Sequence, residues 1–211
     1  MKKFAVLLYP DFSLQEITCL TSALTVWFGE KIDFIASESK GYLREEGFRV
    51  VPTQTTAEVK ITDYDCVILP GTINPLPALF DDELIGFLKS GMDSNVVFAA
   101  ISSSPILLSK AGILTGKKFT SGCFMQMADV FEFVEKGNFI HKGVIEDGNV
   151  ITGIGMFFRE FAETVLRRLG YDLGETFMRE KPEDFTEEEL TFYWSDDDYQ
   201  KFLVELRAYN Q

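Results

Sequence analysis

The 211-residue sequence contains few of the residues from which metal sites and disulfide frameworks are built, namely three cysteines and one histidine. Cys19, Cys66 and Cys123 are odd in number and widely spaced, which matches neither a disulfide framework nor a zinc site. Cys66 falls inside an apolar run and Cys19 on a predicted helix, so both are expected to be small core residues. The composition therefore predicts a protein with no metal ion and no other cofactor.

Long hydrophobic runs are also missing. The first apolar run, from Phe4 to Tyr9, ends at Pro10 and Asp11 and is too short for the core of a signal peptide. No stretch approaches the roughly 18 apolar residues of a membrane span. Basic residues are scarce as well, 20 against 33 acidic residues, and the net charge of -13 repels nucleic-acid phosphates and anionic lipids. We expect a cytoplasmic protein that binds neither nucleic acid nor membrane.

Short apolar runs are what the sequence has instead, and apolar residues make up 46% of the chain, enough to bury a full core. Runs rich in Val, Ile and Phe, each bounded by turn residues, occupy residues 2–9, 31–37, 65–71, 95–101, 117–121 and 149–155. Amphipathic stretches separate several of them, at residues 13–28, 76–89, 105–111 and 156–169. Continuous apolar runs are typical of strands buried on both faces, and their alternation with helices implies parallel crossovers. The sequence predicts a doubly wound, flavodoxin-like α/β fold with a mostly parallel sheet flanked by helices.

The C-terminal segment differs from the rest in charge. Residues 171–211 contain 12 acidic and 4 basic residues, a composition shift that marks a boundary. We therefore predict a domain over residues 1–170 and an acidic helical C-terminal extension over residues 171–211. Thr186 and Ser195 are each expected to begin a short helix, and the many apolar side chains there to pack on the body or on a second subunit.

One strand end reads VVFAAISSSPILL over residues 96–108, where a buried run leads directly into three serines. In such sheets, ligands bind at the carboxyl ends of the strands. Ser104 followed by Pro105 is typical of an N-cap and a first helical residue, and Ser103 of a turn. Ser102 comes before the cap is needed, on a sharp strand-to-helix turn that exposes a side chain above the sheet. The position of Ser102 in the sequence is equally consistent with a functional serine and with an ordinary turn residue.

A second strand end is the segment Pro70-Gly71-Thr72. Its glycine lets backbone amides turn towards a ligand. The amides of Thr72 and Ser103 are therefore expected to form an oxyanion hole beside Ser102.

Glu16 follows the first predicted strand and lies at the start of the first predicted helix, at the same edge of the sheet. If burial raises its pKa towards neutrality, its carboxylate can act as an acid/base partner for Ser102. The alternative is structural, because Ser13-x-x-Glu16 matches the capping box, in which the glutamate only binds the N-cap amide. Both interpretations stay open on the sequence alone.

Five segments in order resemble the ThiJ/PfpI family of the class I glutamine amidotransferase-like superfamily. They are FAVLLYPDFSLQEI, DCVILPGT, FAAISSSPILLSKAGILTGKKFTS, IEDGNVITGIG and the helix after it. The resemblance covers residues 1–170 and places the family's carboxylate at Glu16 and its Pro-Gly-Gly oxyanion loop at residues 70–72. It places the cysteine nucleophile at Ser102 and the histidine at Gly122, next to Cys123. Both members of the family's Cys-His dyad are therefore replaced.

His141, the only histidine, lies on a predicted hairpin and is interpreted as a surface residue. The loss of the histidine matters more to a serine than to a cysteine, because a hydroxyl is a poor nucleophile until a base removes its proton. Cys123 is the thiol best placed for a functional role near the pocket.

Two hypotheses follow. In the first, a pocket binds a small carbonyl or amide compound and performs weak hydrolase or hydratase chemistry, with Ser102 as nucleophile and Glu16 as acid/base partner. The residues expected to bind the ligand are Gly71, Thr72, Ser103 and Cys123. In the second, the protein is a non-catalytic family member that acts in ligand binding or stress-related assembly. The resemblance also implies a homodimer.

Overall fold

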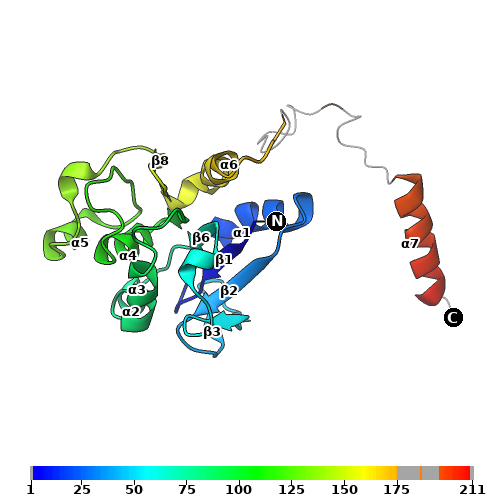
Figure 1. Cartoon of the computed structure of the whole chain (residues 1–211), viewed down its shortest axis with the longest axis horizontal. Helices are drawn as coiled ribbons and strands as arrows, with labels where there is room; N and C mark the ends of the chain where they lie inside the picture. The colour runs from blue at the N-terminus through cyan, green and yellow to red at the C-terminus, as the bar shows by residue number, and fades with distance from the viewer. Residues whose placement is uncertain (1, 175–185, 187–194, 210–211) are drawn as a thin grey trace. The chain divides into compact units, whose positions relative to one another are not determined.

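The computed structural model describes residues 2–174, 186 and 195–209, and its centre is a seven-stranded sheet (Figure 1). The strands lie in the order β5-β2-β1-β6-β7-β9-β8, and every neighbouring pair is parallel except β8 and β9. Their bounds are β1 Phe4–Leu7, β2 Ile32–Ala36, β5 Gln54–Thr55, β6 Cys66–Leu69, β7 Val97–Ile101, β8 Val144–Asp147 and β9 Val150–Gly153. A separate hairpin pairs β3 (Tyr42–Leu43) with β4 (Arg49–Val50). The predicted doubly wound, mostly parallel sheet is confirmed.

The central strands are buried along their whole length, as their continuous apolar sequences require. Their register aligns Val6, Ile68, Ala99 and Ile151 side by side across β1, β6, β7 and β9. Because these four strands are parallel and level, the residues that follow them collect at one edge of the sheet. That edge carries the candidate site.

Helices cover both faces of the sheet (Figure 1). On one side, α1 (Gln15–Ser22), continued by a π-helical turn η1 (Ala23–Trp27), packs against α6 (Phe158–Arg168). On the other, α4 (Pro105–Lys110) contacts the two helices before it. The other helices and helical turns are α2 Leu76–Leu79, α3 Asp82–Lys89, α5 Met125–Val130, η2 Ile61–Asp63, η3 Lys136–Asn138 and η4 Gly155–Phe157.

The helix predicted over residues 76–89 is broken into α2 and α3. Asp81 takes an extended conformation between them and caps α3, since its Oδ1 accepts a hydrogen bond from the Leu84 amide (3.0 Å). A side-chain acceptor at this position starts a new helix where the pattern predicts a continuous one.

The strand predicted over residues 117–121 does not form, and only Phe119 makes a single bridge, with Phe139. Side chains of the neighbouring hairpin take the backbone amides instead: Lys118 N–H donates to Asp147 (2.9 Å) and Thr120 N–H to Thr152 (2.9 Å). The reason is that β8, antiparallel, already occupies the free edge of β9. The hairpin predicted at the Asp-Gly-Asn turn is confirmed by β8 and β9.

The chain divides into two compact units, residues 1–173 and 174–211. In the second, α7 (Asp196–Tyr209) begins as predicted: the Asp198 amide donates to Ser195 Oγ (3.2 Å), and Ser195 Oγ donates to the Asp198 carboxylate (2.8 Å). The helix predicted after Thr186 falls outside the described residues. Within the described ranges, no helix is both long enough and apolar enough to span a bilayer.

Candidate active site

Ser102 lies where the loops that follow β7 and β9 meet the segment after residue 119. It directly follows β7 and has a φ of 62°. Its amide donates to the Gly153 carbonyl (2.7 Å), and its own carbonyl accepts bonds from the Gly122 amide (2.7 Å) and the Ser121 hydroxyl (2.9 Å). The backbone of Ser102 is therefore held from both sides.

The conformation of Ser102 is unfavourable for a residue that carries a side chain. A left-handed φ costs an L-residue about 1–2 kcal/mol, and such residues cluster at functional sites. The turn of residues 102–104 leads straight into α4, which makes it a strand-to-helix elbow. Ser102 stays half-buried, whereas Ser103 and Ser104 are buried. The strained serine is thus the one whose side chain keeps access to a ligand.

Glu16 supplies the second functional group, from the first turn of α1. Its Oε2 accepts a hydrogen bond from the Gly71 amide (2.9 Å), and its carboxylate lies near the Ser102 hydroxyl, since a Cβ at Gly71 would meet both groups. Burial raises the pKa of Glu16 above its ordinary value; the Ser102 hydroxyl and the Gly71 amide oppose the rise, and Glu45 and Glu46 add to it. A carboxylate with a raised pKa beside a serine hydroxyl is placed to accept that proton.

The capping-box interpretation of Glu16 is wrong. Helix α1 begins at Gln15, and the Ser13 hydroxyl makes no hydrogen bond within the described chain. The helix N-terminus is served instead by Glu46, whose Oε1 accepts bonds from the amides of Leu14 (2.8 Å) and Gln15 (2.9 Å). Because another carboxylate takes these amides, Glu16 is free to turn to the elbow.

Three glycines make room for the pair of Ser102 and Glu16. A Cβ at Gly71 would lie 2.7 Å from Ser102 Oγ and would collide with Glu16 Oε2. At Gly155 it would collide with Glu16 Oε1 and lie 3.3 Å from Ser102 Oγ, and at Gly122 it would lie 3.2 Å from Ser102 Cα. Sequence reasoning missed Gly155, although its place two residues after the Gly153 that ends β9 was the available signal.

Ser103 ties the elbow to the loop after β6. Its Oγ accepts a hydrogen bond from the Thr72 amide (2.9 Å) and donates to the Thr72 carbonyl (2.8 Å). The prediction that the Thr72 amide is an oxyanion donor is therefore wrong, because the buried Ser103 hydroxyl uses it. The Gly71 amide is likewise engaged, with Glu16. Within the described chain the Ser103 amide makes no hydrogen bond, so it remains the candidate donor.

Ser104 occupies the predicted N-cap position of α4 but makes no capping bond. Its fully buried hydroxyl instead shares its one proton between the carbonyls of Leu69 and Ile101, each 2.8 Å from Oγ. These carbonyls end β6 and β7, so Ser104 joins the ends of two strands beneath the elbow.

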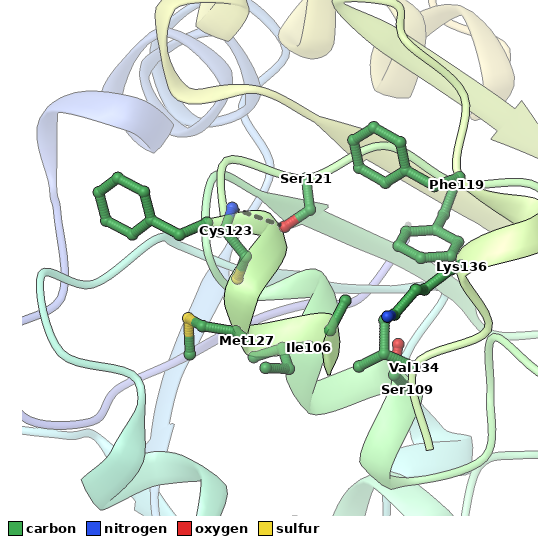
Figure 2. A pocket seen from close by; sticks show the side chains of 11 residues that line it. Ile106, Ser109, Phe119, Ser121, Cys123, Met127, Val134 and Lys136 are labelled. Atoms are coloured by element: carbon green, nitrogen blue, oxygen red, sulfur yellow. Dashed lines mark hydrogen bonds between the residues drawn. The ribbon is translucent and has the colours of Figure 1, made fainter. Parts of the chain in front are cut away.

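Cys123 contacts the elbow through Ser103 and lines the small cavity drawn in Figure 2. Its thiol donates to the Ser103 carbonyl (3.3 Å), and its amide donates to the Ser121 hydroxyl (3.1 Å). Burial raises the pKa of the Cys123 thiol, against the opposing effect of the bond with Ser121. A raised pKa leaves less thiolate and a weaker nucleophile. These contacts favour a structural role for Cys123.

A small apolar cavity of about 30 Å³ adjoins Cys123 (Figure 2). This volume corresponds to one water molecule and is too small for an organic ligand. A larger hollow of about 470 Å³ lies between residues 56–62 and α3. Neither has Ser102 or Glu16 in its lining.

The remaining candidates lie apart from this chemistry. His141 is exposed and packs edge-on against Phe139 (5.0 Å between ring centroids), as expected of a surface residue. Cys66 is buried in β6, where burial raises its thiol pKa well above its ordinary value, and Cys19 is half-buried. Across residues 2–174, 186 and 195–209, no three His, Cys, Asp or Glu side chains are grouped to hold a metal ion.

A doubly wound sheet with a strained serine at a strand-to-helix turn, beside a half-buried carboxylate, defines an α/β protein with a nucleophile-elbow arrangement. Residues 2–168 match the DJ-1/PfpI family. The chain belongs to this family, and the resemblance seen in the sequence is confirmed.

The chain matches these relatives over only part of their length. The chain is 32% identical over 109 residues to "DJ-1 protein homolog E" of Arabidopsis thaliana, which is 51% of this chain and 27% of that protein. It is 32% identical over 110 residues to "Protein dj-1beta" of Drosophila melanogaster, which is 51% of this chain and 56% of that protein. Among solved structures, a DJ-1 superfamily protein from Agrobacterium tumefaciens gives a TM-score of 0.73 at 20% identity, over 97% of this chain and 99% of that one. That likeness shows a common fold.

Proposed function

We propose that the elbow binds a small carbonyl or amide compound and hydrolyses it slowly, with Ser102 as nucleophile and Glu16 as acid/base partner. The observation that carries this proposal is the φ of 62° at Ser102 together with the Glu16 carboxylate beside its hydroxyl. A turn that served only to start α4 would not need this strain, because Ser104 and Pro105 begin the helix.

The chemistry follows from the contacts. Ser102 Oγ attacks the carbonyl carbon while the Glu16 carboxylate takes the hydroxyl proton, and Glu16 then passes this proton to the leaving group. Glu16 then takes a proton from water, whose oxygen attacks the acyl carbon; the bond from that carbon to Ser102 Oγ breaks, and Glu16 returns the proton to Oγ. The Ser103 amide is the donor that faces the developing oxyanion. One donor and no histidine imply slow turnover.

A second function, ligand binding or assembly without catalysis, is favoured by other observations. The cysteine and histidine that the family resemblance places at residues 102 and 122 are both absent, and the Thr72 amide is engaged with Ser103. A site that binds a ligand without reacting needs neither a nucleophile nor two oxyanion donors.

Labelling with a fluorophosphonate separates the two functions. In the hydrolase, the intact mass rises by one adduct, and the adduct is lost in Ser102→Ala. In the non-catalytic protein no adduct forms, whereas Ser102→Cys is readily alkylated by iodoacetamide because the site is open. An adduct that persists in Ser102→Ala contradicts the assignment of the nucleophile.

We further propose that the protein is a cytoplasmic homodimer. Three apolar residues follow the site's segments directly and are largely exposed, namely Ile73 (75%), Phe124 (79%) and Met156 (80%). Exposed large apolar side chains that share one edge are typical of interaction surfaces. Light scattering coupled to gel filtration tests the dimer, and a monomer mass at micromolar concentration contradicts it.

A further inference from the structure

Buried polar atoms without a hydrogen-bond partner gather beside the elbow. The described chain has five such side-chain atoms, and four of them belong to Ser13 (Oγ) and Arg44 (Nε, Nη1 and Nη2). The two residues are neighbours, because Phe12, next to Ser13, forms a backbone bridge with Arg44. Native proteins seldom leave buried donors unpaired, so a cluster of them calls for a cause.

The Arg44 side chain is fully buried, yet its donors are poorly served. The Phe48 ring lies over the guanidinium carbon, 2.9 Å from the ring centroid. A ring covers the face of the guanidinium, whereas the N–H groups point outward in its plane and need acceptors there. Arg44 pairs with Glu46, whose Oε2 is 3.3 Å from Nη1 in an ion pair without hydrogen-bond geometry.

The Glu46 carboxylate occupies what is chemically an anion site. Its Oε1 accepts the amides of Leu14 and Gln15 at the start of α1, where the helix dipole favours negative charge, and its Oε2 faces Arg44. The two carboxylate oxygens of Glu46 leave the Ser13 hydroxyl and the guanidinium N–H groups without a hydrogen-bond acceptor. An oxyanion that is free to settle between these donors can bind a guanidinium through two parallel bonds.

Glu46 can leave this place, but Arg44 cannot. The Glu46 side chain is 29% exposed and lies in the β3–β4 loop next to Gly47, whose surroundings are open. Rotation of the Glu46 side chain into water needs no movement of the buried arginine. Exchange of its carboxylate for a monoanionic group also leaves the local charge unchanged.

We propose that the start of α1, Ser13 and Arg44 form a binding site for an oxyanion, and that Glu46 fills this site when no ligand is bound. The oxyanion is a phosphate or carboxylate group of the small molecule that reaches the elbow, since Glu16 is the residue after Gln15. This last link, to the elbow's ligand, rests on the proposed function; the oxyanion site itself does not.

Titration with inorganic phosphate and with acetate, followed by calorimetry, tests the site. Glu46→Ala should bind at least one of them about tenfold or more tighter than the wild type, because the tethered competitor is gone. Glu45→Ala is the matched control, since it removes the same charge from the same loop but leaves Glu46 in place. Arg44→Lys in the Glu46→Ala background should weaken binding, because lysine lacks the planar fork.

Equal affinity in Glu46→Ala and Glu45→Ala overturns the proposal, as does binding that Arg44→Lys leaves unchanged. Glu46→Gln guards against loss of fold in Glu46→Ala, because its amide oxygen still caps α1 while its charge is removed. It should bind the oxyanion more tightly than the wild type, and a value equal to the wild type counts against the site. Fluorophosphonate labelling of the same variants reports on Ser102 separately, so failure of the oxyanion site and failure of the proposed hydrolysis give different results.

Discussion

The Ser102 turn and the Cys123 turn lie next to each other and differ in what their side chains can do. Ser102 is strained, half-buried and lies beside a carboxylate. Cys123 directs its thiol to a backbone carbonyl, and burial raises its pKa. The intrinsically better nucleophile therefore sits in the less reactive setting. The difference teaches that position and partners, more than residue type, decide which group at this edge performs chemistry.

The largest effect is expected from Glu16→Gln. The amide keeps the shape and can still accept the Gly71 hydrogen bond, but it cannot take the Ser102 proton. Loss of a general base lowers rates about 10²–10⁴-fold. The rate of fluorophosphonate labelling measures this loss. An unchanged rate would show that Glu16 takes no part in the mechanism, and the Ser102 turn would then have no reactive advantage over the Cys123 turn.

The pH dependence of labelling sharpens the same point. Burial raises the pKa of Glu16 above 4.5, so the carboxylate form is lost while pH is still above that value. The labelling rate should fall as pH drops through this raised pKa, and the fall should disappear in Glu16→Gln. A profile that is the same in both proteins assigns the titration to another group.

Gly155→Ala is expected to have the next largest effect. The new methyl group meets Glu16 Oε1 and pushes the carboxylate away from Ser102. Misplacement of a catalytic group by about 1 Å can lower the rate about 10²-fold. The control is Gly137→Ala, because nothing lies within 4 Å of that position. Equal labelling rates in the two variants would show that the glycine does not position Glu16.

Ser104→Ala should affect stability rather than labelling. It removes the hydroxyl donor of the Leu69 carbonyl, whereas the Ile101 carbonyl keeps its bond from the residue 104 amide (3.2 Å). Loss of such a hydrogen bond costs about 0.5–1.5 kcal/mol in the free energy of unfolding. The exposed Ser39 provides the control, since surface substitutions usually change stability by less than about 0.5 kcal/mol. Urea denaturation monitored by circular dichroism measures both, and equal midpoints would mean that the Ser104 tie is dispensable.

Cys123→Ala is expected to have the smallest effect on chemistry. The thiol's role is one weak hydrogen bond to the Ser103 carbonyl, so the labelling rate should change by no more than about threefold. A tenfold or greater loss of labelling would place the thiol in the mechanism and reverse the comparison between the two turns.

Much of the fold was readable from the sequence because its strands are buried on both faces. Runs such as residues 65–71 and 95–101 have no polar interruption, and only a covered parallel strand suits them. The strand predicted over residues 117–121 was wrong, because apolar content alone does not reveal that β8 already occupies the edge of β9. The continuous helix predicted over residues 76–89 was wrong because the Asp81 side chain caps a new helix, which the amphipathic pattern does not reveal.

The sequence predicted which residues form the candidate site better than it predicted the hydrogen bonds among them. Ser102, Glu16 and Gly71 come together because strand ends of a parallel sheet meet at one edge, which the sequence pattern does show. The partner of the Thr72 amide could not be foreseen, because it depends on which way the Ser103 hydroxyl turns. Glu46 could not be foreseen either, since it reaches the start of α1 from about thirty residues further along the chain.

Gly122 stands where the family resemblance places a histidine, and its backbone lies against Ser102. A Cβ at this position would be 3.2 Å from Ser102 Cα and 3.3 Å from its carbonyl carbon, closer than ordinary contact. These contacts are with the backbone of residue 102, so they would meet a side chain at 122 whichever residue stood at the elbow. A substitution that restored an imidazole at 122 would therefore first have to displace the elbow by a few tenths of an ångström.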